Sequence, residues 1–124
     1  MVDTLGLVLK IVVHEANIQD RDGAKLVLKG CRKQFPRLAL VWADGGYAGK
    51  LVAWTKRYLR WTLQIVKRTD DMKGFKVLPK RWIVERTFGW FNRYRRTSKD
   101  YEQRMKNSES ILLLSMSHLM VRRL

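Results

Sequence analysis

The sequence predicts an α/β domain with a mostly parallel sheet, on the strength of three observations. Apolar runs that suit strands alternate with segments whose apolar residues recur at helical spacing. The predicted order is strand, helix, strand, helix, strand, helix, helix, which is typical of parallel sheets with flanking helices. No internal repeat, low-complexity stretch or linker divides the chain, so residues 1–124 are expected to form one domain.

The first third of the chain predicts a strand followed by a helix. Residues 5–13, LGLVLKIVV, are rich in leucine and β-branched residues, which favours a strand. Asp20 or Asp22 is expected to cap the helix that follows, and Pro36 to end it. The helix should bury one stripe of apolar residues: Ala24, Val27, Leu28, Cys31 and Phe35.

The middle of the chain predicts two strands around a second helix. Residues 38–43, LALVWA, form a continuous apolar run, which favours a strand buried on both faces. A helix is expected over 49–59 and another strand over 61–66, WTLQIV. The polar residues 67–80 predict a loop, with a short strand at 75–77.

Two helices are predicted in the last third. The first should cover 80–96, and the second 108–123 with Asn107 or Ser108 as its cap. The first of them should pack on the sheet through its apolar residues: Ile83, Val84, Phe88, Phe91 and Tyr94.

The charge balance indicates a polyanionic partner. The chain has 26 Lys and Arg against 11 Asp and Glu, a formal net charge of +15. Nucleic acid is the usual partner of such a surface, and membrane surfaces and acidic proteins are the alternatives. The single cysteine, Cys31, excludes an internal disulfide, and no apolar segment is long enough to span a bilayer. A cytoplasmic protein is therefore expected.

Asp44 is the first candidate for chemistry. It follows a predicted strand, and open α/β sheets bind ligands at the carboxyl ends of their strands. Gly45 and Gly46 come next and leave room for a ligand or another backbone. The alternative interpretation is a turn aspartate that bonds its own backbone.

Glu85 is the second candidate. At helical spacing Glu85 shares one face with Arg81, one turn before it. The residues that follow on the same face are Gly89, Asn92, Arg93 and Arg96. A metal-bridged phosphate needs such a surface, because the carboxylate binds the ion while cations bind the phosphodiester. An ordinary salt-bridged, exposed helix face is the alternative interpretation.

Three stretches of the chain resemble the DDE transposases of bacterial insertion sequences, most closely the group usually numbered five. They are VDTLGLVLKIVVHEANIQDRDGAK, VWADGGYAGK and LPKRWIVERTFGWFNRYRRTSKDYE, in the family's order and approximate spacing. A lone DGGY would be a weak signal. DGGYAGK followed at the right distance by RWIVERTFGW is a specific one.

The resemblance implies a ribonuclease-H-like fold, as in retroviral integrases, whose three carboxylates bind two divalent ions, usually Mg²⁺ or otherwise Mn²⁺. Asp44 matches the second aspartate and Glu85 the catalytic glutamate, so both are expected to be metal ligands. Arg81 matches the arginine four residues before that glutamate. Arginines near the glutamate are expected to bind DNA: Arg81, Arg86, Arg93, Arg95 and Arg96.

The sequence departs from the family's pattern at three places. Leu78 stands where a tyrosine is expected, and Asn92, with Arg93 beside it, stands where a basic residue is expected. The family's first aspartate lies on a strand before VDTLG, and Asp3 belongs to the VDTLG hairpin instead. We therefore expect the C-terminal part of a catalytic domain without its first strand, as a truncated copy or second reading frame that is inactive alone.

The resemblance implies metal-dependent cleavage and transfer of DNA strands in transposition. The expected partners are insertion-sequence ends and target DNA, the product of an upstream reading frame and a second copy of the chain, with no membrane. The alternative function is a non-catalytic basic DNA-binding protein or a regulator of transposition, since the charge of +15 needs no metal. A basic ribosomal or RNA-binding protein fits the α/β pattern less well.

Overall fold

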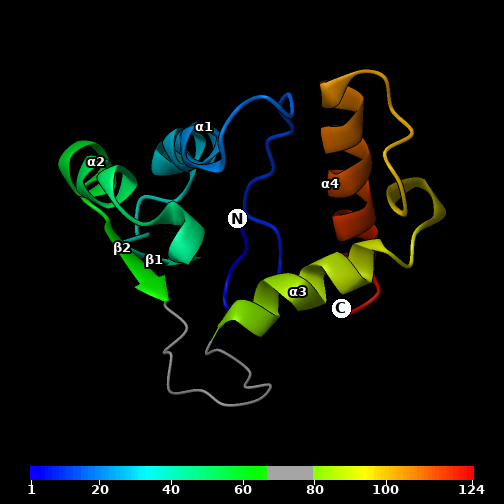
Figure 1. Ribbon diagram of the computed structural model, residues 1–124. Coiled ribbons are helices and arrows are strands. Elements are labelled where there is room, and N and C mark those ends of the chain that lie inside the picture. Colours follow the sequence, from blue (N-terminus) through cyan, green and yellow to red (C-terminus); the bar gives the residue numbers. More distant parts are fainter. Residues whose placement is uncertain (67–79) are drawn as a thin grey trace, which may run out of the picture. The chain divides into compact units, whose positions relative to one another are not determined.

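The computed structural model describes residues 1–66 and 80–124 and shows a mixed α/β chain (Figure 1). Its elements are α1 (Asp20–Gln34), β1 (Leu40–Asp44), the 3-10 turn η1 (Gly45–Tyr47), α2 (Lys50–Leu59), β2 (Thr62–Val66), α3 (Arg81–Phe91), the 3-10 turn η2 (Arg95–Thr97) and α4 (Met105–Val121). The predicted loop over 67–80 and its short strand lie outside the described residues, apart from Lys80.

The chain divides into two compact units. The first combines Met1–Ala16 with Ile83–Leu124, and the second is the continuous segment Asn17–Trp82.

The second unit contains a two-stranded parallel sheet. β1 and β2 pair in register from Leu40 with Thr62 to Asp44 with Val66, and α2 connects them (Figure 1). The two strands, the helix between them and the parallel pairing were all predicted from the sequence and are confirmed.

The core of the second unit lies where α1, α2 and β2 meet. Leu28 and Cys31 of α1 are buried, which confirms the predicted stripe at its centre. Leu51 of α2 and Trp61, just before β2, are almost fully buried with them. Thr55 is buried as well. Its hydroxyl donates to the Leu51 carbonyl oxygen at 2.8 Å, so this polar group has a hydrogen-bond partner although it is removed from water.

The prediction that β1 is buried on both faces is wrong. Leu40 is 37% exposed, and its partner Thr62 on the same face is exposed too. α2 packs against β2, where Leu63 is buried on the opposite face. Within this unit the sheet is therefore covered on one face, and the apolar run of β1 does not distinguish one-sided from two-sided burial.

The predicted helix caps are also wrong in detail. α1 begins after Gln19, which makes no side-chain cap bond, and Asp20 and Asp22 lie inside the first turn. Negative charge in the first turn still stabilises the helix through its dipole. α4 begins at Met105 after Arg104, earlier than the predicted caps at 107 or 108.

Residues 5–13 do not form the predicted strand. Val2 and Val8 make an isolated antiparallel bridge around a turn, which confirms the hairpin expected at Asp3. The Asp3 carboxylate accepts hydrogen bonds from the amides of Leu5 and Leu7, at 2.9 and 2.8 Å. The turn bends the chain inside the predicted strand, and the following backbone has no strand to pair with among the described residues of this unit.

Apolar side chains of the N-terminal segment pack instead on two helices. Trp90 and Phe91 of α3 and Met116 of α4 form the core of the first unit. The partly buried residues packed against it come from the N-terminal segment and from α4: Leu7, Val8, Ile11, Leu112 and Leu119. The amide of Val13 donates to Glu109 of α4 at 2.8 Å, so a side chain takes the place of a strand partner.

The predicted buried face of α3 is confirmed at Phe91 and wrong at Val84 and Phe88. Phe88 is 61% exposed and Val84 is 42% exposed, whereas Thr87 is buried. The Thr87 hydroxyl donates to the Gly6 carbonyl oxygen at 2.6 Å and turns the helix face that carries it toward the hairpin. This polar contact and the burial of Trp90 and Phe91 together rotate the buried face of α3 away from the one that its apolar pattern predicts.

α3 is also shorter than predicted. It ends at Phe91 because the Phe91 carbonyl oxygen accepts bonds from the Tyr94 amide and the Thr97 hydroxyl, which closes a turn there. In the described part of the chain, no helix combines the length and apolar character needed to cross a membrane.

Candidate active site and nucleic-acid interface

Asp44 lies at the carboxyl end of β1 and is exposed. Its Oδ1 accepts a hydrogen bond from the Gly46 amide at 2.9 Å, so the turn interpretation is confirmed. A Cβ added at Gly46 would lie 3.1 Å from the same oxygen, which explains the small residue there. The bond fixes the carboxylate and leaves Oδ2 without a hydrogen bond from any described residue.

Arg21 connects α1 to this turn. Its Nε donates to the Gly46 carbonyl oxygen at 3.2 Å, so the start of α1 lies against η1. Sequence reasoning treated this region only as a helix start. A usable signal was present, because a helix that precedes a strand in an α/β unit runs antiparallel to it, and its start then lies beside the end of the strand.

Tyr47 belongs to the same turn and is affected by the negative charges of two carboxylates. Burial raises the pKa of its hydroxyl above the ordinary value, and the charges of Asp20 and Asp44 raise it further. The phenol is therefore neutral at physiological pH and is close enough to both carboxylates to feel their charge. Sequence reasoning missed Tyr47 as part of the surroundings of Asp44.

Glu85 lies on α3 in the first unit and is exposed. Arg81 and Gly89 are four residues before and after it on the same helix, so they share its face. A Cβ added at Gly89 would meet no atom within 4 Å, so this part of the helix is open. Because α3 ends at Phe91, the predicted extension of the face to Asn92, Arg93 and Arg96 is wrong.

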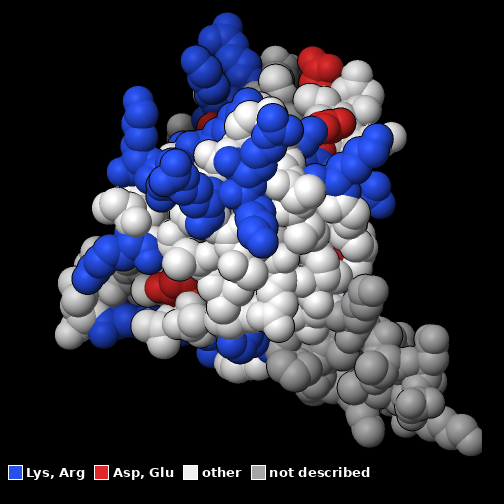
Figure 2. Space-filling view, turned by 90° about the vertical axis from the view of Figure 1, so that its left-hand side faces the viewer, with Lys and Arg blue, Asp and Glu red and all other residues white. Residues whose placement is uncertain are grey.

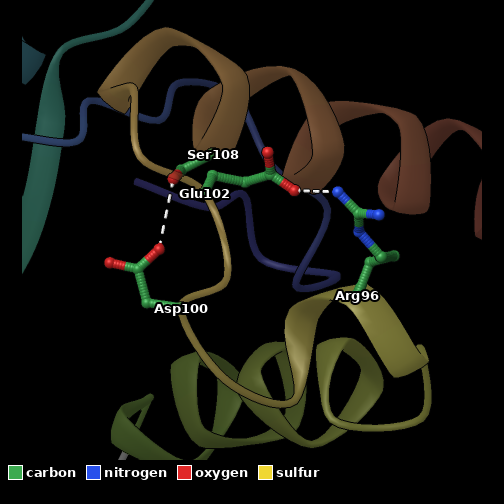
Figure 3. A network of polar contacts seen from close by, with 4 residues as sticks. All are labelled: Arg96, Asp100, Glu102 and Ser108. Atoms are coloured by element: carbon green, nitrogen blue, oxygen red, sulfur yellow. Dashed lines mark hydrogen bonds and ion pairs between the residues drawn. The ribbon is translucent and has the colours of Figure 1, made fainter.

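Two of the arginines predicted to bind DNA make contacts within their own unit. Arg86 is half-buried, donates to the Leu5 carbonyl oxygen at 2.6 Å and lies 5.0 Å from the centre of the Trp90 ring. Arg96 forms an ion pair with Glu102 (Figure 3). The other three, Arg81, Arg93 and Arg95, are exposed.

Acidic side chains near Arg96 are engaged in the connection between η2 and α4. Figure 3 shows Glu102 directed toward Arg96, and Asp100 toward the Ser108 hydroxyl, 3.4 Å away. The Asp100 contact connects the segment before α4 to the helix, and the Glu102 contact connects it to η2. Both carboxylates therefore have a structural role.

The donor chemistry of Asp44 and Glu85 fits a hard divalent cation. Carboxylate oxygens are the protein ligands that Mg²⁺ and Mn²⁺ prefer, and Asp44 presents one oxygen beyond the turn bond. Among the residues that the structure describes, no three His, Cys, Asp or Glu side chains are grouped so as to hold a metal ion. Asp44 belongs to the second unit and Glu85 to the first.

A mixed α/β chain with a carboxylate at the end of a parallel strand and a large excess of cations has the features of a nucleic-acid-processing domain. The family model of the transposase DDE domain matches residues 1–120. The chain belongs to this family, which confirms the resemblance at that level. No curated protein and no solved structure matches the chain significantly.

Proposed function

We propose that this protein acts in DNA transposition as part of the ribonuclease-H-like catalytic domain of an insertion-sequence transposase, spanning residues 1–124. The family match over residues 1–120 carries the proposal, since members of this family cleave and join DNA strands. The location of Asp44 at the carboxyl end of a parallel strand supports it, because α/β sheets bind ligands there.

Asp44 and Glu85 are the proposed ligands of Mg²⁺ or Mn²⁺. Ions held there would supply Lewis-acid chemistry, which activates an attacking water or 3′-hydroxyl and stabilises the leaving oxygen. The Gly46 amide orients the Asp44 carboxylate, and Arg21 stabilises the turn by donating a hydrogen bond to the Gly46 carbonyl oxygen. Exposed arginines 81, 93 and 95 offset phosphate charge on the DNA.

The family's site uses three carboxylates, and the motifs matched in this chain assign two. We infer that cleavage by this chain alone is weak or absent. A two-ligand site binds a divalent ion less tightly and leaves more of the bridging charge uncompensated. A joined segment that supplies a strand and a third carboxylate should restore cleavage.

A supercoiled-plasmid cleavage assay in Mg²⁺ tests this function. The chain is assayed alone and joined to the first strand of a related DDE transposase, with Asp44→Asn, Glu85→Gln and Asp100→Asn introduced into the joined protein. The first two substitutions should lower the cleavage rate by more than about a hundredfold. Loss of a residue that only hydrogen-bonds to a metal ligand already lowers metal affinity or activity by about ten- to a hundredfold. Asp100→Asn removes a carboxylate that contacts Ser108 and should have little effect.

The assay has a clear contrary outcome. Robust Mg²⁺-dependent cleavage that ignores both Asp44→Asn and Glu85→Gln would show that the site is elsewhere. Cleavage by the unjoined chain at the full rate would show that two assigned carboxylates suffice.

A non-catalytic DNA-binding protein that regulates transposition is the second candidate function. The net charge of +15 favours it, because phosphate binding through counterion release needs no metal. DNA binding that persists in EDTA and after both carboxylate substitutions, without cleavage by the joined protein, would favour this candidate.

A further inference from the structure

We propose that cations and aromatic rings on α1 and α2 bind the phosphate backbone of duplex DNA. The residues differ from the carboxylates and arginines considered above. This surface, termed the α1–α2 strip, consists of Lys25, Lys29, Arg32, Trp54, Arg57 and Tyr58. The inference rests on the proposed DNA substrate and adds the place on the second unit where its backbone is held.

Charge is segregated along the second unit. Between Gly23 and Ala43 the sequence has five basic residues and no acidic one, and between Gly45 and Val66 it has four basic and no acidic. Figure 2 faces the side of the second unit on which α1 and α2 lie, and Lys and Arg side chains gather in that view. Such an array repels itself unless a polyanion covers it.

Contacts with two rings place the α1 cations along one side of the helix. Lys25 and Lys29 are one helical turn apart, and their Nζ atoms lie 6.0 and 5.8 Å from the centre of the Trp54 ring on α2. Arg32 follows on the same helix, with its guanidinium 6.0 Å from the centre of the Trp61 ring. The α1 cations thus line the side of α1 that faces α2.

The strip continues across α2. The Trp54 and Tyr58 ring centroids are 5.7 Å apart, and the Arg57 guanidinium lies 5.7 Å from the Tyr58 ring centre. Tyr58 is 63% exposed, so this end of the strip is at the surface. Two packed helices therefore present these cations and rings as one row.

Three of these cations remain available for phosphate. Lys25 pairs with Asp22 at 3.0 Å, but no acidic side chain in the described part of the chain pairs with Lys29, Arg32 or Arg57. Each ring of the strip has a cation within 6.0 Å of its centre, so positive charge accompanies both rings along the strip. This arrangement favours the continuous charge of a duplex backbone over a single strand, whose binding depends on stacking.

The test measures binding to a random-sequence DNA duplex in EDTA over a range of salt concentrations. The triple variant Lys29→Gln/Arg32→Gln/Arg57→Gln should bind roughly ten- to a hundredfold more weakly at 0.1 M salt. The slope of log affinity against log salt should fall by about 2.7, or about 0.9 for each lost phosphate contact. The matched control Lys99→Gln/Lys106→Gln/Arg122→Gln removes three exposed charges from the first unit and should change the slope by less than about 1.

A double variant guards against unfolding. Arg32 covers the buried Trp61 ring, so Lys29→Gln/Arg57→Gln leaves that contact in place and should still lower the slope by about 1.8. Circular dichroism checks that each variant is folded. EDTA makes the binding measurement independent of metal. If cleavage is absent but duplex binding depends on the strip, the proposed catalytic function is contradicted and the inference about the strip stands.

Three outcomes would overturn the inference. An equal loss in the matched control would show that affinity comes from diffuse charge. Tighter binding to single-stranded DNA or RNA than to the duplex would assign the strip to another nucleic acid. Tighter binding to phosphatidylserine vesicles than to duplex DNA would assign it to a lipid surface.

Discussion

Each of the two compact units is stabilised by its own internal contacts, and these contacts span different distances along the sequence in the two units. In the described part of the second unit the polar side-chain contacts span no more than 25 residues: Thr55 bonds Leu51, four residues away, and Arg21 bonds Gly46, 25 residues away. In the first unit Thr87 bonds Gly6 across 81 residues, and Glu109 bonds Val13 across 96. The second unit thus depends mainly on apolar packing of neighbouring elements, and the first also on a few polar contacts between distant segments.

The largest expected effect of a single substitution falls on the core of the second unit. Leu51→Ala removes a side chain that is 2% exposed and should lower the free energy of unfolding by about 2–5 kcal/mol. Chemical denaturation measures the change, and hydrogen exchange shows whether α2 and β2 lose protection first. The control Leu114→Ala alters a side chain that is 67% exposed and should change stability by less than about 1 kcal/mol.

The polar contact between distant segments of the first unit gives the next effect. Thr87→Val keeps the shape of the side chain but removes the hydroxyl that donates to Gly6, and should cost about 1–3 kcal/mol. Thr62→Val, at an exposed position of β2, is the matched control and should be nearly neutral or stabilising, since valine favours strands. Equal stability of the two variants would contradict a structural role for the Thr87 hydroxyl.

A pair of glycine substitutions sharpens the same contrast. Gly6 has φ of +82°, and an added Cβ would lie 3.0 Å from the Thr87 hydroxyl oxygen, so Gly6→Ala should cost about 1–3 kcal/mol. Gly89→Ala on α3 meets open space and should stabilise the protein by about 0.5–1 kcal/mol. Thermal unfolding of the two variants distinguishes these opposite signs.

The smallest expected effect is a pH dependence in the second unit. Because the pKa of Tyr47 is raised, the folded protein holds this proton more tightly than the unfolded chain. The resulting stability is fully present below the ordinary tyrosine pKa of about 10 and is lost as pH rises through the higher folded value. A difference titration of phenolate absorbance between wild type and Tyr47→Phe should have its midpoint above 10, and a midpoint below 10 would contradict the assignment.

Local patterns predicted the second unit well because its elements are satisfied locally. The apolar stripe around Leu28 and Cys31, the break at Pro36 and the strand before Asp44 all follow from neighbouring residues. Burial of β1 on both faces was wrong, because the run does not indicate what covers each face.

Predictions for the first unit failed where distant segments decide the outcome. The strand over 5–13 is replaced by a hairpin and a segment packed on α3 and α4, and α3 buries Thr87 and Trp90 beside Phe91 in place of Val84 and Phe88. Periodicity carries no information about partners 81 residues away. For the candidate site, the sequence identified Asp44 and its turn but missed Arg21 and Tyr47, which reach it from α1 and η1.

A double-substitution cycle on metal affinity tests the central proposal, that Asp44 and Glu85 share divalent ions. Mn²⁺ binding is measured by electron paramagnetic resonance in the presence of duplex DNA, for wild type, Asp44→Asn, Glu85→Gln and the double variant. If the carboxylates share an ion site, each single substitution weakens binding and the double variant is little weaker than the worse single one. Independent, additive losses, or affinity that neither substitution changes, would contradict a shared site.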